Sequence, residues 1–392
     1  MQKRGERRFW MWLGQRLRSP ACLVLGLWLT ARLIGLALGW LLWQLGLVPP
    51  DPATPPQVYL DVGPVAGWAL GVWQRLDTPS YLSIAAQGYR ADNGSVVFAP
   101  LYPLLIRLVG TALGGQFLLA ALLISSVACV GLLALLYQIT AREFDAGSAR
   151  RAVVYQIFFP AAYVLIAAYA EPLMLCLILL AFLWARRGRW GLAGTAACLA
   201  TLTRFQAVVV VLPLTYIYLR RFGLTRRAWH PEVLALVAAP AALLGYHVYL
   251  AWPGLPSVET GLAQQWYAML ALPGTNLLNA LRALLAGGMT LPRALSLGLT
   301  ILFLVLTGVA FRRLSPEYGL YMAAILLYTL SRYEPGGRAL LSVSRPVLAA
   351  FPGFMLLGAA GRRRWLHRLI LYSSLALYLF LMGIFFLGGY AG

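Results

Sequence analysis

The sequence contains little charge: Asp, Glu, Lys and Arg make up only 11% of its 392 residues. A soluble domain is typically about a quarter charged, so the composition argues against a water-soluble globular protein. Hydrophobic residues make up 61%, and several apolar runs reach the ~20 residues that a helix needs to cross a bilayer. Strand-like alternation is absent, which argues against a barrel. The composition therefore predicts an all-α polytopic membrane protein.

Residues that bind metals are scarce. There are three scattered histidines and no HExxH or DxD motif, so we predict no metal site. There is also no Walker loop and no GxGxxG before a helix, so neither a nucleotide donor nor another cofactor is expected. The four cysteines lie in apolar runs without a CxxC pair and are interpreted as small core residues: Cys22, Cys129, Cys176 and Cys198.

Lysine is almost missing, because Lys3 is the only one and arginine supplies the rest of a net charge of +20. Such a charge could indicate nucleic-acid binding, but its placement argues against that partner. Of the 32 basic residues, 22 lie in short clusters at 3–18, 142–151, 186–189, 220–227, 312–313 and 362–368. Basic loops between apolar spans stay in the cytoplasm, so all six clusters are predicted to be inside.

That constraint predicts eleven spans in a single membrane domain, 1–392, with the N-terminus inside and the C-terminus outside. The predicted spans are 20–46, 116–138, 152–168, 170–185, 190–203, 205–219, 231–252, 293–311, 318–331, 346–360 and 369–390. The pairs 152–185 and 190–219 are short for two crossings each, so broken or re-entrant segments are expected there.

Three longer segments are then placed outside: a first external loop at 47–115, a second at 253–292, and 332–345. Within the first loop, 66–77 and 100–110 are predicted to be helices lying along the interface. Trp68, Trp73 and Tyr102 would anchor them at the level of the lipid headgroups.

Three charged residues lie where charge is expensive: Arg32 inside the first span, Glu171 at an outer helix end, and Arg204 between two short spans. Each is a functional-site hypothesis, because an ionisable group near the bilayer interior costs several kcal/mol unless it is paired or wet. Two alternatives are open: a structural hydrogen bond for Arg32, and an ion pair of Glu171 with Arg204 or Arg345. A GxxxG at Gly35 and Gly39 indicates close helix packing.

The most informative stretch runs from Asp77 to Arg107, DTPSYLSIAAQGYRADNGSVVFAPLYPLLIR. Asp77 begins an external segment among aromatic residues, where a carboxylate could act as a general base. Asp-Thr-Pro-Ser is also a good helix N-cap sequence, so a purely structural role for Asp77 is open on the residues alone.

This stretch resembles the PIG-V family, the GPI mannosyltransferase II type with its bacterial relatives, within the GT-C superfamily. The match runs through Asp77, Tyr81, Leu82, Ile84, Ala85, Gly88, Tyr89, Pro100, Tyr102 and Pro103. Later segments are similar too: Tyr169-Ala-Glu171-Pro, Thr203-Arg204, and Arg345 in the run that ends in Phe351-Pro352. The chain departs from the pattern at Leu76, where the family has tryptophan, at Ala99, and at Phe205-Gln206.

The resemblance implies a GT-C-like transmembrane helix bundle whose catalytic residues are Asp77, as base, and Glu171, which positions the base or a sugar hydroxyl. Arg204 and Arg345 would bind the donor phosphate, with Arg338 as a weaker candidate, since guanidinium bonds to phosphate are strong. Tyr81, Tyr89 and Tyr102 would line the acceptor site. An interfacial aromatic belt and headgroup contacts of the arginines are the structural alternatives.

The expected function is therefore an inverting, metal-independent transferase in the inner membrane, with its active site on the extracytoplasmic side. Its partners would be membrane lipids, a polyprenyl-phosphate hexose donor and a lipid-linked or cell-surface glycan acceptor. The resemblance alone favours mannose. One alternative is a flippase for lipid-linked sugars, which should show two related halves; the sequence shows no such repeat. The other is a non-catalytic scaffold of an envelope assembly, which leaves the cost of Glu171 and Arg204 unexplained.

Overall fold

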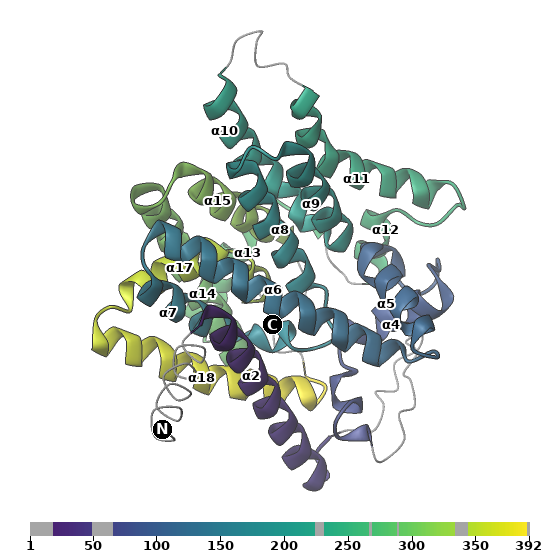
Figure 1. Ribbon diagram of the computed structural model, residues 1–392. Helices are drawn as coiled ribbons and strands as arrows, with labels where there is room; N and C mark the ends of the chain where they lie inside the picture. Colours follow the sequence, from purple (N-terminus) through teal and green to yellow (C-terminus); the bar gives the residue numbers. More distant parts are fainter. Residues whose placement is uncertain are drawn as a thin grey trace, which may run out of the picture.

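The computed structural model describes residues 19–48, 66–223, 231–265, 269–287, 290–333 and 344–389, and most of them are helical (Figure 1). The α-helices are α2 (Pro20–Gln44), α4 (Thr78–Gln87), α5 (Leu101–Ala112), α6 (Phe117–Glu143), α7 (Ala146–Ile157), α8 (Glu171–Arg186), α9 (Trp190–Thr203), α10 (Val211–Phe222), α11 (Leu234–Ala251), α12 (Val258–Gln265), α13 (Thr275–Leu285), α14 (Leu291–Arg313), α15 (Pro316–Leu330), α16 (Ser344–Leu348), α17 (Phe351–Ala360) and α18 (Arg364–Phe386). The 3₁₀ helices are η1 (Gly71–Trp73), η2 (Ser95–Val97), η3 (Ala162–Leu165), η4 (Phe205–Val210) and η6 (Pro231–Val233). Two short strands, β1 (Met269–Leu270) and β2 (Arg332–Tyr333), pair antiparallel.

Six helical segments of the described chain are long and apolar enough to cross a membrane. They are Pro20–Gln44, Phe117–Glu143, Phe205–Phe222, Pro231–Ala251, Leu291–Arg313 and Arg364–Phe386. Three shorter helices, α5, α9 and α17, are also apolar. The prediction of an all-α polytopic membrane protein is confirmed, whereas the count of eleven spans stays a prediction.

Three predicted segments differ from the observed helices, in each case near proline or glycine. The span 152–168 is interrupted, in agreement with the broken segment expected in the short pair 152–185. Helix α7 ends at Ile157, just before Phe158-Phe-Pro160, and the residue before a proline avoids the helical region. The span 346–360 is broken between α16 and α17, where Pro352 cannot continue the preceding helix. The predicted helix at 66–77 is wrong for most of its length, since only residues 66–67 are α-helical and the rest form turns and the three-residue η1. The helix predicted at 100–110 is present as α5, and its place along the interface stays a prediction. The segment 253–292, predicted to be a second external loop, contains two helices that were not predicted, α12 and α13.

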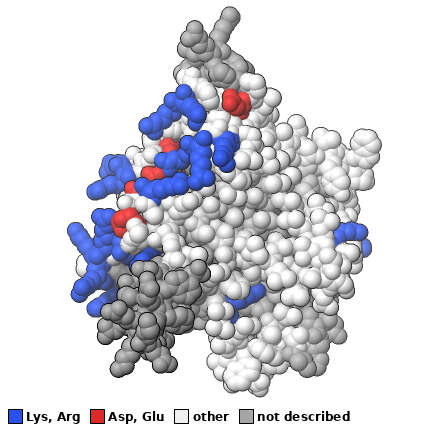
Figure 2. Space-filling view, in the orientation of Figure 1, with Lys and Arg blue, Asp and Glu red and all other residues white. Residues whose placement is uncertain are grey.

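The basic residues gather along one edge of the molecule (Figure 2). Ion pairs join three of the clusters there: Arg186 of α8 pairs with Glu143 of α6, and Arg362 pairs with Asp145 before α7. In the same orientation, α4, α5 and α12 lie at the opposite edge (Figure 1). The charge pattern therefore gives the molecule two unlike ends, and α4 and α5, from the segment predicted to be the first external loop, lie at the end away from the basic residues.

Helix α2 packs closely on the segment before α4. The glycines predicted to allow close packing do so, because a Cβ on Gly35 would lie 2.8 Å from the Trp73 ring and one on Gly39 would lie 3.2 Å from Val72. Trp73 is 1% exposed and meets the Phe386 ring edge-on at 5.0 Å. Its predicted role as a headgroup anchor is wrong, since it is a core residue that joins α2 to α18.

The segment 158–170 is not α-helical, since its one regular element is the four-residue η3, and it is apolar and buried throughout. Non-helical backbone at membrane depth requires partners for its peptide groups, because no water is present to supply them. Side chains from three other helices donate hydrogen bonds to carbonyls of this segment. Arg32 Nη1 donates to Ile166 O at 2.6 Å. Thr78 Oγ1 donates to Ala168 O at 3.2 Å, and Ser125 Oγ donates to Tyr169 O at 2.8 Å. The structural hydrogen bond considered for Arg32 is therefore present, and the segment it supports leads directly to Glu171.

Replacement of Arg32 by methionine is expected to lower the free energy of unfolding by about 1.5–3 kcal/mol, because it removes a charge-assisted hydrogen bond to a buried carbonyl. Chemical denaturation in detergent micelles measures this value. The control is Arg313→Met at the exposed end of α14, which is expected to change stability by less than about 0.5 kcal/mol. Equal stability of the two variants would show that the Ile166 carbonyl does not depend on Arg32.

Candidate functional site

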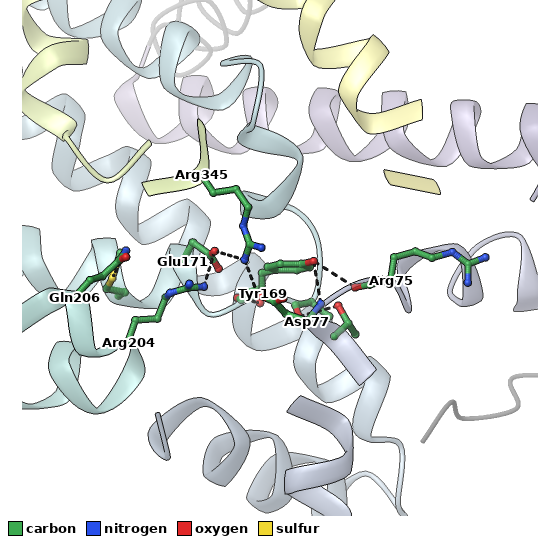
Figure 3. A network of polar contacts seen from close by, with 11 residues as sticks. Arg75, Asp77, Tyr169, Glu171, Arg204, Gln206 and Arg345 are labelled. Atoms are coloured by element: carbon green, nitrogen blue, oxygen red, sulfur yellow. Dashed lines mark hydrogen bonds and ion pairs between the residues drawn. The ribbon is translucent and has the colours of Figure 1, made fainter. Parts of the chain in front are cut away.

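Four charged residues from distant segments meet in one buried cluster (Figure 3). Asp77 precedes α4, Glu171 begins α8, Arg204 lies between α9 and η4, and Arg345 lies in α16. Arg345 Nη2 donates to Asp77 Oδ2 at 2.6 Å and to Glu171 Oε1 at 2.7 Å, and Arg204 Nη1 donates to the same Glu171 Oε1 at 2.6 Å. We call these four residues the ionic cluster. Both partners considered for Glu171 are therefore bonded to it at once.

The start of α4 directs the Asp77 carboxylate into the ionic cluster. Asp77 occupies the N-cap position, but its side chain makes no capping hydrogen bond, which removes the simplest structural explanation for this residue. The residue before it, Leu76, has a φ of +56°, a region that side-chain-bearing residues rarely adopt. Such strain persists only where the surrounding structure holds it, and it is common at functional sites.

Tyr169 joins the parts of the cluster to one another. Its hydroxyl accepts from the Asp77 N–H at 3.3 Å and donates to Arg75 O at 3.3 Å, while its ring lies 4.8 Å below the Arg345 guanidinium. The guanidinium of Arg75 points away from the cluster, toward Phe386 O (Figure 3). Tyr169 was within a matched motif but was not predicted as a site residue; its position two residues before Glu171 was the only signal.

The formal charges of the cluster sum to zero, because it contains two carboxylates and two guanidiniums, and little of it is exposed to solvent. The side chains of Asp77, Glu171 and Arg345 are 10%, 4% and 6% exposed, whereas that of Arg204 is 21% exposed. Glu171 Oε2 is buried and has no hydrogen-bond partner in the part of the chain that the structure describes. A buried carboxylate oxygen without a partner is costly, so this atom is a natural acceptor for a hydroxyl donated from outside the protein.

Two predicted tyrosines pack behind the ionic cluster. The Tyr81 ring meets the rings of Phe98 at 5.0 Å and Tyr102 at 4.9 Å, both edge-on. Burial raises the pKa of the Tyr81 hydroxyl, so the group stays protonated and neutral beside the charges. Tyr102 is fully buried and bonds to Ser125 at 2.6 Å, so it supports Tyr81 and is not an interfacial anchor.

The other predicted residues lie elsewhere. Tyr89 is at the far end of α4, where its hydroxyl donates to Phe98 O at 2.9 Å. Arg338 lies outside the described residues. Gln206, in the pair that departs from the family pattern, donates to Met174 Sδ at 3.4 Å beside the cluster. Among the described residues, no group of three or more His, Cys, Asp or Glu side chains could hold a metal ion.

Taken as chemistry, the cluster offers a carboxylate that can accept a proton and two guanidiniums that can bind an anion. Guanidinium donors match phosphate oxygens in spacing and are stronger in a site from which water is excluded. The four residues of the cluster come from four separate segments, and the first and the last, Asp77 and Arg345, are 268 residues apart in the sequence.

No protein-family model and no curated protein sequence matches this chain. Solved structures with a similar arrangement of helices include ArnT from Cupriavidus metallidurans in the apo state, with a TM-score of 0.46 and 17% identity over 84% of this chain and 77% of that one. The same protein bound to undecaprenyl phosphate has a TM-score of 0.43 and 15% identity, over 92% of this chain and 76% of that one. The Archaeoglobus fulgidus oligosaccharyltransferase in complex with Zn and sulfate has a TM-score of 0.44 and 15% identity, over 93% of this chain and 53% of that one.

Proposed function

We propose that this chain is a metal-independent glycosyltransferase of the GT-C type. It moves a hexose from a polyprenyl-phosphate donor to a lipid-linked or cell-surface glycan on the extracytoplasmic side of the inner membrane, and the PIG-V-like motifs favour mannose. The observation that carries this proposal is the bond of one guanidinium, Arg345, to both Asp77 and Glu171. Because buried charge at membrane depth is expensive, a cluster of four such groups is typical of a functional site.

In the proposed reaction the acceptor hydroxyl oxygen attacks C1 of the sugar, and the bond from C1 to the phosphate oxygen breaks with its electron pair going to the phosphate. Asp77 takes the hydroxyl proton. Arg204 and Arg345 stabilise the negative charge that develops on the departing polyprenyl phosphate. A single displacement at C1 inverts its configuration, in keeping with one catalytic carboxylate acting as a base and not as a nucleophile.

Arg345 connects donor binding to release of the base. In the structure its Nη2 donates to Asp77 Oδ2, so this oxygen is already bonded to a cation. A guanidinium has five N–H donors, so a donor phosphate could take over part of this group while Arg345 remains bonded to Glu171. The phosphate would thus free Asp77 Oδ2 for the acceptor, and Glu171 Oε2 would accept a sugar hydroxyl.

The position of the cluster favours chemistry on the extracytoplasmic side. The helix α4, which begins at Asp77, lies at the edge opposite the basic residues (Figures 1 and 2). Since basic loops are retained in the cytoplasm, this end of the molecule faces outward. Donors that carry the sugar on a membrane lipid are the ones available there.

Reconstitution of the purified protein in liposomes tests the proposal. The liposomes contain a polyprenyl-phosphate hexose labelled in the sugar, either mannose or glucose, together with a lipid extract as acceptor. Transfer of label to the acceptor is the expected result, with mannose preferred. Movement of the donor between leaflets without transfer would show a flippase. If the protein neither transfers the sugar nor moves the donor, with mannose or with glucose, the non-catalytic scaffold is the alternative that remains.

Tyr169→Phe is expected to lower the rate of transfer about tenfold or more, because it removes the hydroxyl that fixes the Asp77 backbone while the ring under Arg345 remains. The matched control is Tyr321→Phe. The Tyr321 hydroxyl is equally buried and donates to Ala349 O at 3.0 Å. Both variants are expected to lose about 1 kcal/mol of stability, but only the first should lower kcat. Equal kcat values for the two would contradict a positioning role for Tyr169.

A further inference from the structure

A second site of charged residues lies at the far end of α8 from Glu171. A cavity of about 340 Å³ is found there, between the last turns of α6 and α8. Arg142 and Glu143 line it from α6, and Arg186 and Arg187 line it from the end of α8. The rest of the lining is apolar: Ile139, Phe182 and Leu183. We call it the arginine cavity.

Acids and an aromatic ring fix Arg186 in the wall of the arginine cavity. Its Nη1 donates to Glu143 Oε1 and to the Tyr318 hydroxyl, and its guanidinium lies 5.5 Å from the centre of the Tyr318 ring. The buried carboxylate of Glu317 lies 3.9 Å from its Nε, and the Tyr318 ring stacks on that of Phe182 at 5.7 Å. A planar guanidinium held on several sides keeps one orientation, so an anion that enters the cavity meets a preformed donor.

Arg142 and Arg187 are the guanidiniums available to a ligand. Neither side chain forms a hydrogen bond or an ion pair within the part of the chain that the structure describes. The lining thus contains three guanidiniums and one carboxylate, and the nearby Glu317 adds only one more negative charge. Arginines at a helix end are also favoured by the helix dipole and by membrane topology, but neither effect gathers them around a cavity. The surplus of positive charge favours an anion as the occupant.

Phosphate esters match these donors in charge, geometry and size. Guanidiniums pair with phosphate oxygens through two parallel N–H bonds, and a phosphate diester keeps two oxygens free for them. The cavity volume of about 340 Å³ is many times the roughly 30 Å³ that one water molecule occupies, so it takes a phosphate together with a short polar group. Glu143 can accept a hydroxyl of that group, because a carboxylate is an acceptor only.

We propose that the arginine cavity binds an anionic phosphate ester at the face of the membrane that the basic residues place in the cytoplasm, with the phosphate on Arg142, Arg186 and Arg187. Such a phosphate comes from the headgroup of an anionic lipid in the inner leaflet or from a soluble ester. Basic pockets between membrane helices at this face are typical sites for anionic headgroups. The 16 residues of α8 place Arg186 about 23 Å from Glu171, so this site is separate from the ionic cluster.

The two arginines without partners allow a test that leaves the bonds of Arg186 intact. The cavity variant is the double substitution Arg142→Gln and Arg187→Gln. The control is the double substitution Arg312→Gln and Arg313→Gln at the exposed end of α14, which removes the same charge from a helix end outside the cavity. Binding is measured by native mass spectrometry of the full-length protein in micelles. The probes are phosphatidylglycerol, phosphatidylcholine, whose choline is a cation, and soluble glycerol 3-phosphate.

We expect the unaltered protein and the control to bind phosphatidylglycerol at least tenfold more tightly than phosphatidylcholine, and the cavity variant to lose at least tenfold in that affinity. If glycerol 3-phosphate binds more tightly than phosphatidylglycerol, with the same loss in the cavity variant, the site is supported and its ligand is a soluble ester. Equal binding of the two lipids, equal losses in the two double variants, or no binding of either anionic ester would overturn the proposal. Because none of these measurements uses sugar transfer, their outcome does not depend on the proposed function.

Discussion

Asp77→Asn is expected to lower the rate of sugar transfer by about 10²–10⁴, the usual contribution of a general base. Asparagine has nearly the same shape and its amide oxygen can still accept from Arg345, so the ionic cluster keeps its geometry. The amide cannot take a proton from the acceptor hydroxyl. The loss should therefore appear in kcat, with donor binding nearly unchanged or improved, because one negative charge near the phosphate has been removed.

The matched control is Asp92→Asn in the same loop region. Asp92 is exposed and pairs with Arg90 at 2.8 Å, and a surface ion pair of this kind contributes about 0–1 kcal/mol. Steady-state transfer in proteoliposomes and thermal unfolding in detergent are measured for both variants. Transfer by Asp77→Asn at a rate close to that of Asp92→Asn, with both proteins folded, would mean that another group accepts the proton.

The sequence predicted most long helices because a membrane span depends on local composition. The helices α2, α6, α8, α9 and α14 lie within a few residues of the apolar runs that indicated them. Segment 158–170 is just as apolar, yet it is not α-helical. Its backbone groups are satisfied by Arg32, Thr78 and Ser125, which come from other helices. The sequence indicated a break here, because the pair 152–185 is short for two crossings. Hydropathy does not show where the break lies, because the partners that permit it are distant in sequence.

The site was predictable to the extent that charge at membrane depth is costly. That cost singled out Glu171 and Arg204, and the resemblance added Asp77 and Arg345; the structure brings all four together. The shared guanidinium and the orphan oxygen of Glu171 depend on geometry that no motif encodes. Tyr169 was missed for a related reason, since a tyrosine near a helix end is typical of an aromatic belt and only its contacts distinguish it.

Arg345→Met is expected to lower the free energy of unfolding by about 3–5 kcal/mol, because it removes one partner of a buried ion pair. Arg345 is 6% exposed and donates to two acids. Glu171 keeps its ion pair with Arg204, whereas Asp77 loses its ion pair with Arg345, so the destabilisation falls mainly on Asp77. Transfer should also be lost, since the donor phosphate loses one of its two cations.

The charge argument is tested by a second substitution that removes the surplus negative charge. In the Arg345→Met background, Asp77→Asn is expected to recover most of the lost stability while transfer stays absent. Packing alone predicts the opposite, because an amide fills the gap left by the guanidinium no better than a carboxylate does. A double variant as unstable as Arg345→Met would therefore show that Arg345 stabilises the fold by its contacts. Recovery would show that the Arg345 guanidinium offsets the charge of Asp77 at this depth, which the proposed mechanism requires if a donor phosphate is to redirect that guanidinium.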